Sequence, residues 1–507
     1  MRWSIAAVTV AFAALGPATA SAAVFSVNTT ADLADAAQDG VCDANAATPG
    51  EQCTLRAAIR EANATVAEDR VDLPGGTFAL GSQLAVTSSV EIAGDGARST
   101  AVTGASLTFG GTCGSADGLC TAELSDLTVE DGGGITSSSH LSLARVTVRD
   151  NLKGPTTGLA PFGGGVFVGA VGAAVASNLT IVDSTISGNR VVGFPAFLTN
   201  GMGGGVAVVS VGTVTITNST IAGNSATGGD ALGGGIGFQM ANVIVRSSTV
   251  AGNTASATTG LASGGNLYRT VAADAPQPGT LVLRDSIVSG GSVSGPGTNV
   301  GPNCSAGAVT GQSGRNIDSG STCALASPSL SNTDPMLSVL GDHGGPTDVA
   351  PPAESSPALN AALSACPVTD QRGVTRPQGG ACDIGAVERV RAGTPPGDDP
   401  PGDGQPGSDP PGDGQPGSDP RGDGPPADDQ PGGDDGRSRT PDGSSPPGDR
   451  CARALTGTRA ANVLEGTPFG DLIRGGAGND RLFGGGGADC LAGQAGSDRL
   501  WGGGGAD

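Results

Sequence analysis

Histidine, aromatic residues other than Phe, and positive charge are all scarce in this sequence, and each scarcity excludes a class of function. Only His140 and His343 are present, so a zinc site or a Ser-His-Asp triad would have to use one of them. Beyond the first residues there is one Tyr, Tyr268, and one Trp, Trp501, which disfavours a groove that stacks sugar rings. The net charge of -22 argues against nucleic acid or an anionic membrane as a partner.

Long hydrophobic runs are also missing, so no membrane span is predicted. The chain opens with Arg2, an apolar run from Ile5 to Leu15, and the small residues Ala20-Ser21-Ala22. This order is typical of a signal peptide, here residues 1–22, with Ala18-Thr19-Ala20 as a competing cleavage site. We therefore expect a protein that is secreted, extracellular or held at the cell surface.

The ten cysteines contain no C-x-x-C pair, and an even number in an exported chain favours disulfides over metal thiolates. They fall into couples that are close in the sequence, although spacing alone does not decide the connectivity. The simplest pairing joins Cys42 with Cys53, Cys113 with Cys120, Cys304 with Cys323, Cys366 with Cys382, and Cys451 with Cys490.

The end of the chain repeats glycine and aspartate every nine residues, as in Gly475-Gly476-Ala477-Gly478-Asn479-Asp480-Arg481-Leu482-Phe483. A large apolar residue follows each carboxylate by two positions, at Ile473, Leu482, Leu491 and Leu500, and Leu464 follows Asn462, which stands at the equivalent place one unit earlier. Glycines permit tight turns with positive φ, and carboxylate and carbonyl oxygens are the ligands that calcium prefers. A flexible glycine-rich tail is the alternative, but it would not hold Asp and Leu in phase.

This spacing resembles the repeats-in-toxin family, whose unit is GGxGxDxUx with U a large apolar residue. The resemblance implies a parallel β-roll in which two units make one coil, so that Asp471 works with Asp489, Asp480 with Asp498, and Asp489 with Asp507. The cofactor would be calcium. The last unit stops at its sixth residue, so the array could continue in a longer protein. The expected calcium-binding residues are Asp471, Gly475, Gly476, Gly478, Asp480, Gly484, Gly485, Gly487, Asp489, Gly493, Gly496, Asp498 and Asp507.

A second, longer repeat lies upstream, in copies that end in Gly-Asn at Asn189, Asn224 and Asn253. Each copy alternates Val, Ile and Thr with a period of two, which predicts strands, and a Gly-Gly-Gly-apolar step precedes it. The copies resemble right-handed, pectate-lyase-like parallel β-helices, in which a repeated Asn forms an internal ladder. We expect these three residues, with Asn151, to form that ladder and to adopt the left-handed backbone of the bend.

Two further segments resemble modules of exported bacterial proteins. Cys53-Thr54-Leu55-Arg56-Ala57-Ala58-Ile59 is similar to the CSLREA domain, with Thr54 and Ala57 replacing the Ser and Glu that name the motif. Leu55, Ile59 and Ala62 would lie on one face of a short helix that caps the solenoid. Asp370 to Pro377 and Gly380 to Glu388 resemble the choice-of-anchor Q domain.

These segments predict an all-β chain in six parts. One of them, rich in Pro, Gly and Asp, has too little apolar surface to fold. The parts are a signal peptide at 1–22, a CSLREA-like cap at 23–85, a right-handed parallel β-helix at 86–330, a choice-of-anchor Q-like region at 331–390, a disordered linker at 391–450 and a calcium-binding β-roll at 451–507.

Aligning the strands of the β-helix places Asp126, Arg145, Asp183, Asn218, Ser247 and Asp285 in one row. Neighbouring strands lie about 4.8 Å apart, so the row would stack an acid, a base and an acid at Asp126, Arg145 and Asp183. This spacing suits carbohydrate cleavage. The alternative is a row at a bend whose charges compensate one another.

The sequence therefore predicts a calcium-binding β-helix protein with a structural, adhesive or interaction role, whose partners are calcium ions and cell-surface glycans or proteins. The alternative function is an extracellular polysaccharide lyase or glycoside hydrolase that acts in a groove of the β-helix. A secreted toxin is a third possibility, but the sequence contains no effector motif.

Overall fold

The structure is a computed structural model with two compact units, Met1–Arg391 and Ala392–Asp507. Nearly all of the predicted signal peptide and the whole predicted linker lie outside the described residues. The described ranges are 22–45, 47–50, 52–65, 67–154, 161–170, 176–193, 200–270, 279–390, 453–459, 463–465, 471–486 and 490–504.

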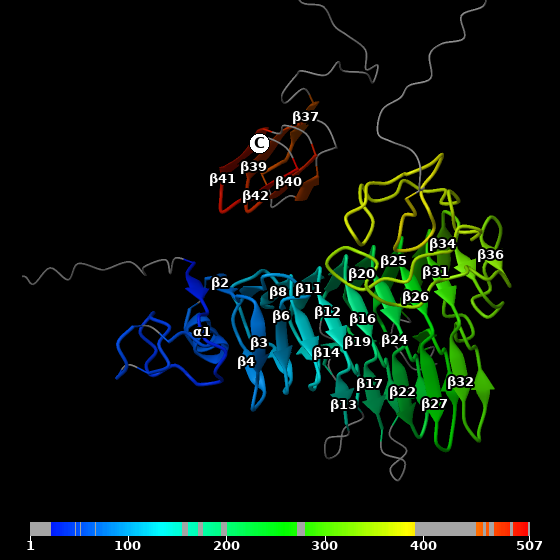
Figure 1. Cartoon of the computed structure of the whole chain (residues 1–507), viewed down its shortest axis with the longest axis horizontal. Helices are drawn as coiled ribbons and strands as arrows, with labels where there is room; N and C mark the ends of the chain where they lie inside the picture. The colour runs from blue at the N-terminus through cyan, green and yellow to red at the C-terminus, as the bar shows by residue number, and fades with distance from the viewer. Residues whose placement is uncertain are drawn as a thin grey trace, which may run out of the picture. The chain divides into compact units, whose positions relative to one another are not determined.

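The first unit is a parallel β-helix built from five sheets (Figure 1). Sheet A has the order β1 (Val24–Ser26), β2 (Asp69–Asp72), β5 (Val90–Ala93), β8 (Thr121–Ser125), β11 (His140–Ala144), β15 (Leu179–Val182), β20 (Thr213–Thr217), β25 (Asn242–Arg246), β30 (Thr280–Arg284) and β34 (Gly311–Ser313). Sheet B has the order β3 (Gly76–Ala79), β6 (Thr100–Thr103), β9 (Thr128–Glu130), β12 (Thr147–Arg149), β16 (Thr185–Ser187), β21 (Thr220–Ala222), β26 (Thr249–Ala251), β31 (Ile287–Ser289), β35 (Ile317–Asp318) and β36 (Leu330–Ser331).

Three shorter sheets complete the coils. Sheet C contains β4 (Leu84–Val86), β7 (Leu107–Phe109), β10 (Ile135–Ser137), β14 (Val166–Gly169), β19 (Val206–Val209), β24 (Ile236–Gln239) and β29 (Leu267–Arg269). Sheet D contains β13 (Leu152–Lys153), β17 (Arg190–Val192), β22 (Ser225–Gly228), β27 (Thr254–Ala257) and β32 (Ser292–Ser294), and sheet E contains β18 (Gly201–Met202), β23 (Ala231–Leu232), β28 (Ala262–Ser263) and β33 (Asn299–Val300).

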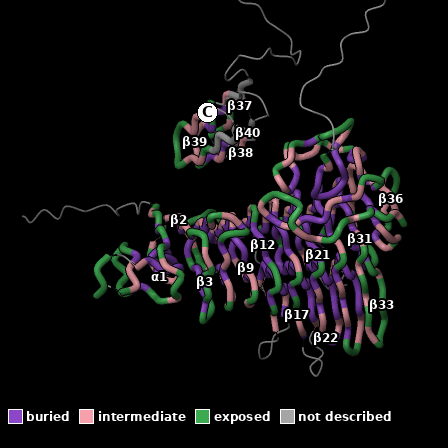
Figure 2. The backbone as a smooth tube through the Cα atoms, viewed as in Figure 1, coloured by how far each residue is buried: buried purple, intermediate pink, exposed green. Residues whose placement is uncertain are grey.

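The register of the strands follows the sequence repeat. Leu179 pairs with Val214, and Val214 pairs with Val243, so equivalent residues of successive copies stack on one another. Alternate residues point inward, and Val214 and Ile216 are completely buried, as Figure 2 shows for the inside of the coils. The period-two pattern therefore builds one continuous apolar core along the solenoid.

The predicted asparagine ladder is present. The side-chain amide of Asn151 donates to Asn189 Oδ1, that of Asn189 to Asn224 Oδ1, and that of Asn224 to Asn253 Oδ1, at 2.9–3.0 Å. The expected left-handed backbone is instead at the preceding residue, for example Gly188 with φ 65, because glycine adopts positive φ without a steric cost. Sequence reasoning missed the extension of the ladder, which continues from Asn253 to Asn266, Asn303 and Asp318.

The Gly-Gly-Gly steps form a second stacked turn. A Cβ atom on Gly204 would collide with the carbonyl oxygen of Gly234 in the next coil. Glycine is required there because the two backbones approach too closely for any side chain.

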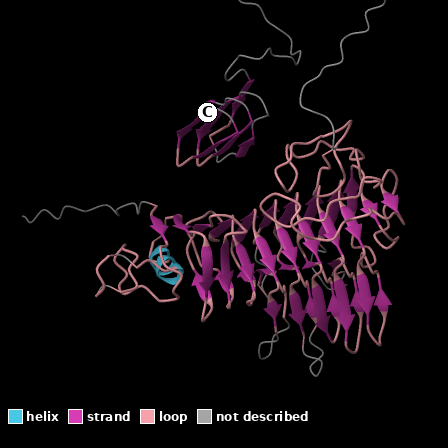
Figure 3. Cartoon of the chain, viewed as in Figure 1, coloured by secondary structure: helices cyan, strands magenta, loops and turns pink. Residues whose placement is uncertain are grey.

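The only described helix, α1 (Leu55–Ala62), lies at the amino-terminal end of the solenoid (Figure 3). Thr54 caps it, since its Oγ1 accepts a hydrogen bond from the N–H of Ala57 at 3.0 Å. Leu55, Ile59 and Ala62 are buried as their spacing predicts. The described residues contain no helix long and apolar enough to cross a membrane.

Disulfides staple both ends of the solenoid. The structure contains four of the five couples expected from the sequence, and Cys490 is also disulfide-bonded. Its expected partner, Cys451, lies outside the described residues. The four couples are Cys42–Cys53, Cys113–Cys120, Cys304–Cys323 and Cys366–Cys382.

Residues 332–390, called the lobe below, form no named helix or strand and fold back over the corner between sheets A and B. Ile287 and Ile317 of the solenoid share an apolar cluster with Ala358 and Ile384 of the lobe. Gln371 of the lobe is 1% exposed and hydrogen-bonds to Ser184 O and to the hydroxyls of Thr185 and Thr220. The lobe is therefore an integral layer of the first unit.

Candidate functional site

The second unit is a small parallel roll made of two three-stranded sheets. Leu472 pairs with Cys490 and Leu482 with Leu500, so units eighteen residues apart stack on one another and two nonapeptides make one coil. One sheet contains β37 (Arg453–Thr456), β39 (Asp471–Ala477) and β41 (Cys490–Ala495), and the other contains β38 (Val463–Glu465), β40 (Arg481–Gly486) and β42 (Arg499–Gly504).

The apolar residue of each nonapeptide fills the inside of the roll. Ile473 and Leu482 are completely buried, whereas Leu500, in the last described coil, is 43% exposed. The narrow core therefore depends on neighbouring coils covering one another.

Asp480 is a buried carboxylate of the roll, with no exposed surface. Its N–H donates to Asp498 Oδ1 at 2.9 Å, which brings two expected ligands from adjacent coils together. A Cβ atom on Gly475 would collide with Asp480 Oδ2 and with the carbonyl oxygen of Gly493. Carboxylate and main-chain oxygens thus converge beside a turn that only glycine can occupy.

These oxygen donors fit calcium, which accepts carboxylates together with backbone carbonyls. The described residues contain no cluster of three or more His, Cys, Asp or Glu side chains. Gly476, Gly478 and Gly496 have φ of 105, 113 and 137, as the glycine turns require. Of the other expected ligand positions, Gly484 and Gly485 lie in β40, whereas Gly487, Asp489, Asp507 and the side chain of Asp471 lie outside the described residues.

The row of the proposed catalytic residues lies at the corner between sheets A and B. Its six members, Asp126, Arg145, Asp183, Asn218, Ser247 and Asp285, all have φ between 44 and 55. Arg145 Nε donates to Asp126 Oδ1 at 2.7 Å, and a second guanidinium nitrogen bonds to Oδ2. The charges of Arg145 and Asp126 therefore compensate each other at this bend.

Asp183 differs from Asp126 and Arg145 because the lobe packs over its position. Thr347 of the lobe donates a hydrogen bond to Asp183 O, and Asn218, next in the row, donates to Thr369 O. Burial raises the pKa of Asp183 to about 7, against the opposing effects of a hydrogen bond from Asn218 and the charge of Arg145. Asp183 Oδ1 has no hydrogen-bond partner among the residues that the structure describes.

Sequence reasoning missed a serine ladder one residue beyond the corner row. Ser184 Oγ accepts from Val146 N, Ser219 Oγ from Ser184 N, and Ser248 Oγ from Ser219 N. The signal was in the sequence, because each copy contains Ser-Thr at this point. These hydrogen bonds join each coil to the next, and the threonine that follows each serine faces outward.

The comparison with protein families bears on the second unit. The family described as the RTX calcium-binding nonapeptide repeat matches residues 456–490 and 489–507. Among solved structures, the chain is similar to one titled "Crystal structure of pectate lyase Pel9A", with a TM-score of 0.31 and 14% sequence identity. The match covers 73% of this chain and 97% of that chain. No curated protein sequence matches. The carboxy-terminal unit therefore carries RTX calcium-binding nonapeptide repeats, and calcium is the ion that such repeats bind.

Proposed function

We propose that the chain is an exported, calcium-binding β-helix protein that acts outside the cell or at its surface. The observation that carries the proposal is the meeting of Asp480 and Asp498 beside a glycine turn in a roll of stacked nonapeptides. Calcium would neutralise the carboxylates and tie adjacent coils together. The disulfides agree with an oxidising, extracellular compartment.

The β-helix then serves a structural, adhesive or interaction role towards cell-surface glycans or proteins. The CSLREA-like segment at 23–85 and the choice-of-anchor Q-like region at 331–390 support this assignment by resemblance. The roll beyond the linker would take the place of a surface-attachment signal.

The geometry does not favour the second candidate, a polysaccharide lyase or glycoside hydrolase using Asp126, Arg145 and Asp183. The first two bind each other, and the third is packed against the lobe. A reaction at this corner would require the lobe to move away.

Trp501 offers a direct test, because it is the only Trp beyond the predicted signal peptide and lies in β42 of the roll. Calcium added to the chain from residue 23 at roughly millimolar concentration should change its fluorescence, and a chelator should reverse the change. Magnesium should be much less effective, since it demands a tighter octahedral site. Trp501 fluorescence that does not change when calcium is added would overturn the proposal.

A further inference from the structure

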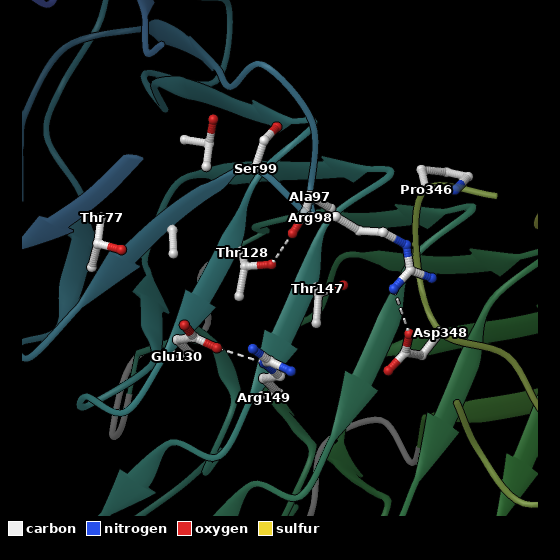
Figure 4. A pocket seen from close by; sticks show the side chains of 12 residues that line it. Thr77, Ala97, Arg98, Ser99, Thr128, Glu130, Thr147, Arg149, Pro346 and Asp348 are labelled. Carbon is white, nitrogen blue, oxygen red and sulfur yellow. Dashed lines mark hydrogen bonds and ion pairs between the residues drawn. The ribbon is translucent and has the colours of Figure 1, made fainter. Parts of the chain in front are cut away.

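A row of outward-facing threonines crosses sheet B, and a cavity interrupts the layer that covers it. The register places Thr128, Thr147, Thr185, Thr220 and Thr249 on adjacent strands. We call these five residues the threonine row. From Thr185 onward the lobe covers the row, whereas a cavity of about 320 Å³ opens above Thr147 (Figure 4).

Four members of the row already bind groups of the polypeptide itself. Thr128 donates to the main-chain carbonyl of Ala97, and Thr185 donates to that of Asp348. Thr220 donates to the side-chain amide oxygen of Gln371, and the Thr249 hydroxyl accepts from the N–H of Ala386. Every one of these partners is an amide group from an irregular segment laid over the sheet.

Thr147 is the exception. Its hydroxyl has no partner in the described part of the chain, and it faces the cavity between the loop that contains Ala97 and the lobe segment that contains Asp348. The next outward position of the same strand is Arg149, which forms an ion pair with Glu130. On the far side, Arg98 bonds to Gly345 O and to Asp348.

The charges of the cavity exclude a strongly ionic ligand. Two guanidinium groups and two carboxylates line it, and they are already paired with each other. The twelve lining residues include no aromatic ring on which a sugar could stack. A neutral ligand that supplies hydrogen-bonding amides fits best.

We infer that this cavity binds an extended polypeptide segment of a partner protein, whose main-chain carbonyl accepts a hydrogen bond from Thr147. The bound segment would continue the layer made by the loop around Ala97 and by the lobe, using the same threonine-to-amide bond. Small, uncharged side chains suit the segment because the surrounding charges are already satisfied. This inference gives the proposed interaction role a location, but it does not depend on calcium binding by the roll.

The test is an array of immobilised random hexapeptides probed with the chain from residue 23 and with three variants. Thr147→Val removes the hydroxyl while keeping the shape of the side chain, and should weaken binding by about five- to tenfold, the effect of one hydrogen bond. The loss should be similar for all binding peptides, because the contact is to the main chain. Ala101→Trp, which fills the cavity from the strand position paired with Thr128, should abolish binding.

Thr180→Val is the matched control, since Thr180 is a partly buried threonine on β15 of sheet A, away from the cavity. It should bind the array as the parent does. Equal binding by the parent, Thr147→Val and Ala101→Trp would overturn the inference. So would the absence of peptide binding, or binding to an oligosaccharide array alone. The response of Trp501 to calcium is measured on the same samples. It shows whether the roll binds calcium, independently of whether the cavity binds peptides.

Discussion

The main-chain N–H of Asp480 lies 2.9 Å from the carboxylate Oδ1 of Asp498, one coil further along the roll. This contact places the recurring aspartates of two nonapeptides on the same side of the roll. The two residues are eighteen positions apart, as expected if two nonapeptides make one coil. The calcium affinity should therefore depend on individual aspartates more than on the acidity of the chain.

Asp498→Asn should raise the calcium concentration at the midpoint of the Trp501 response by about tenfold or more, as expected for the loss of a charged ligand. The roll without calcium should change little, because Asn retains an oxygen that can accept from Asp480 N. Glu354→Gln removes the same charge from a side chain that is 83% exposed and should leave the midpoint unchanged. An equal shift in both variants would mean that bulk charge sets the affinity.

Asp183 should make the stability of the first unit depend on pH. Its pKa is raised from an ordinary value of 3.8 to about 7, so the neutral carboxyl is favoured in the folded state. The stability from this group is complete below about pH 4 and is lost as the pH rises towards 7, by at most about 1.4 kcal/mol per pH unit. The charged groups that act on it are Arg145, Asp370 and Arg376.

Asp183→Asn should flatten this dependence and stabilise the unit at pH 8, as followed by thermal unfolding between pH 4 and 8. Glu354→Gln again serves as the exposed control and should keep the slope of the parent. If the stability of the parent and of Asp183→Asn changed equally with pH, Asp183 would be ionised in the folded protein.

Sequence reasoning succeeded where the same structural position recurs in successive copies of the repeat. The corner row and the four asparagines from Asn151 to Asn253 could be placed from the spacing of the repeat, because copies that stack in register carry each side chain to the same place. Asn266 and Asn303 were missed because the short strands before them, β28 and β33, lack the Val, Ile and Thr alternation that marked the other copies.

The position of the lobe could not be predicted in this way. Many of its contacts with the solenoid join residues far apart in the sequence, such as Thr220 and Gln371, 151 positions apart, and Ser184 and Gln371, 187 positions apart. The lobe has no periodicity that would set a register. For the same reason, neither the cover over Asp183 nor the cavity above Thr147 could be predicted from the sequence.

Asn224→Ala should destabilise the first unit by roughly 3 kcal/mol, because it breaks the ladder in its middle. The Asn224 amide donates to Asn253 Oδ1 and Ile186 O, and its Oδ1 accepts from Asn189, all inside the solenoid. Asn242→Ala is the matched control, since within the described ranges this exposed side chain accepts only from Thr280, and the substitution should cost less than about 1 kcal/mol. Urea unfolding measures both, and equal losses would contradict a structural role for the ladder.

Gln371→Leu should loosen the lobe while leaving the coils of the solenoid folded. The side-chain amide of Gln371 bonds to Ser184 O, Thr185 and Thr347, and its oxygen accepts from Thr220. Leucine would leave these buried groups without partners, at a cost of about 1–3 kcal/mol for each group that water cannot reach. Because the solenoid core is separate from this contact, we expect faster amide hydrogen exchange across residues 342–388 and unchanged exchange in β20 and β25. Uniformly faster exchange in both regions would show instead that the lobe and the coils unfold as one cooperative unit.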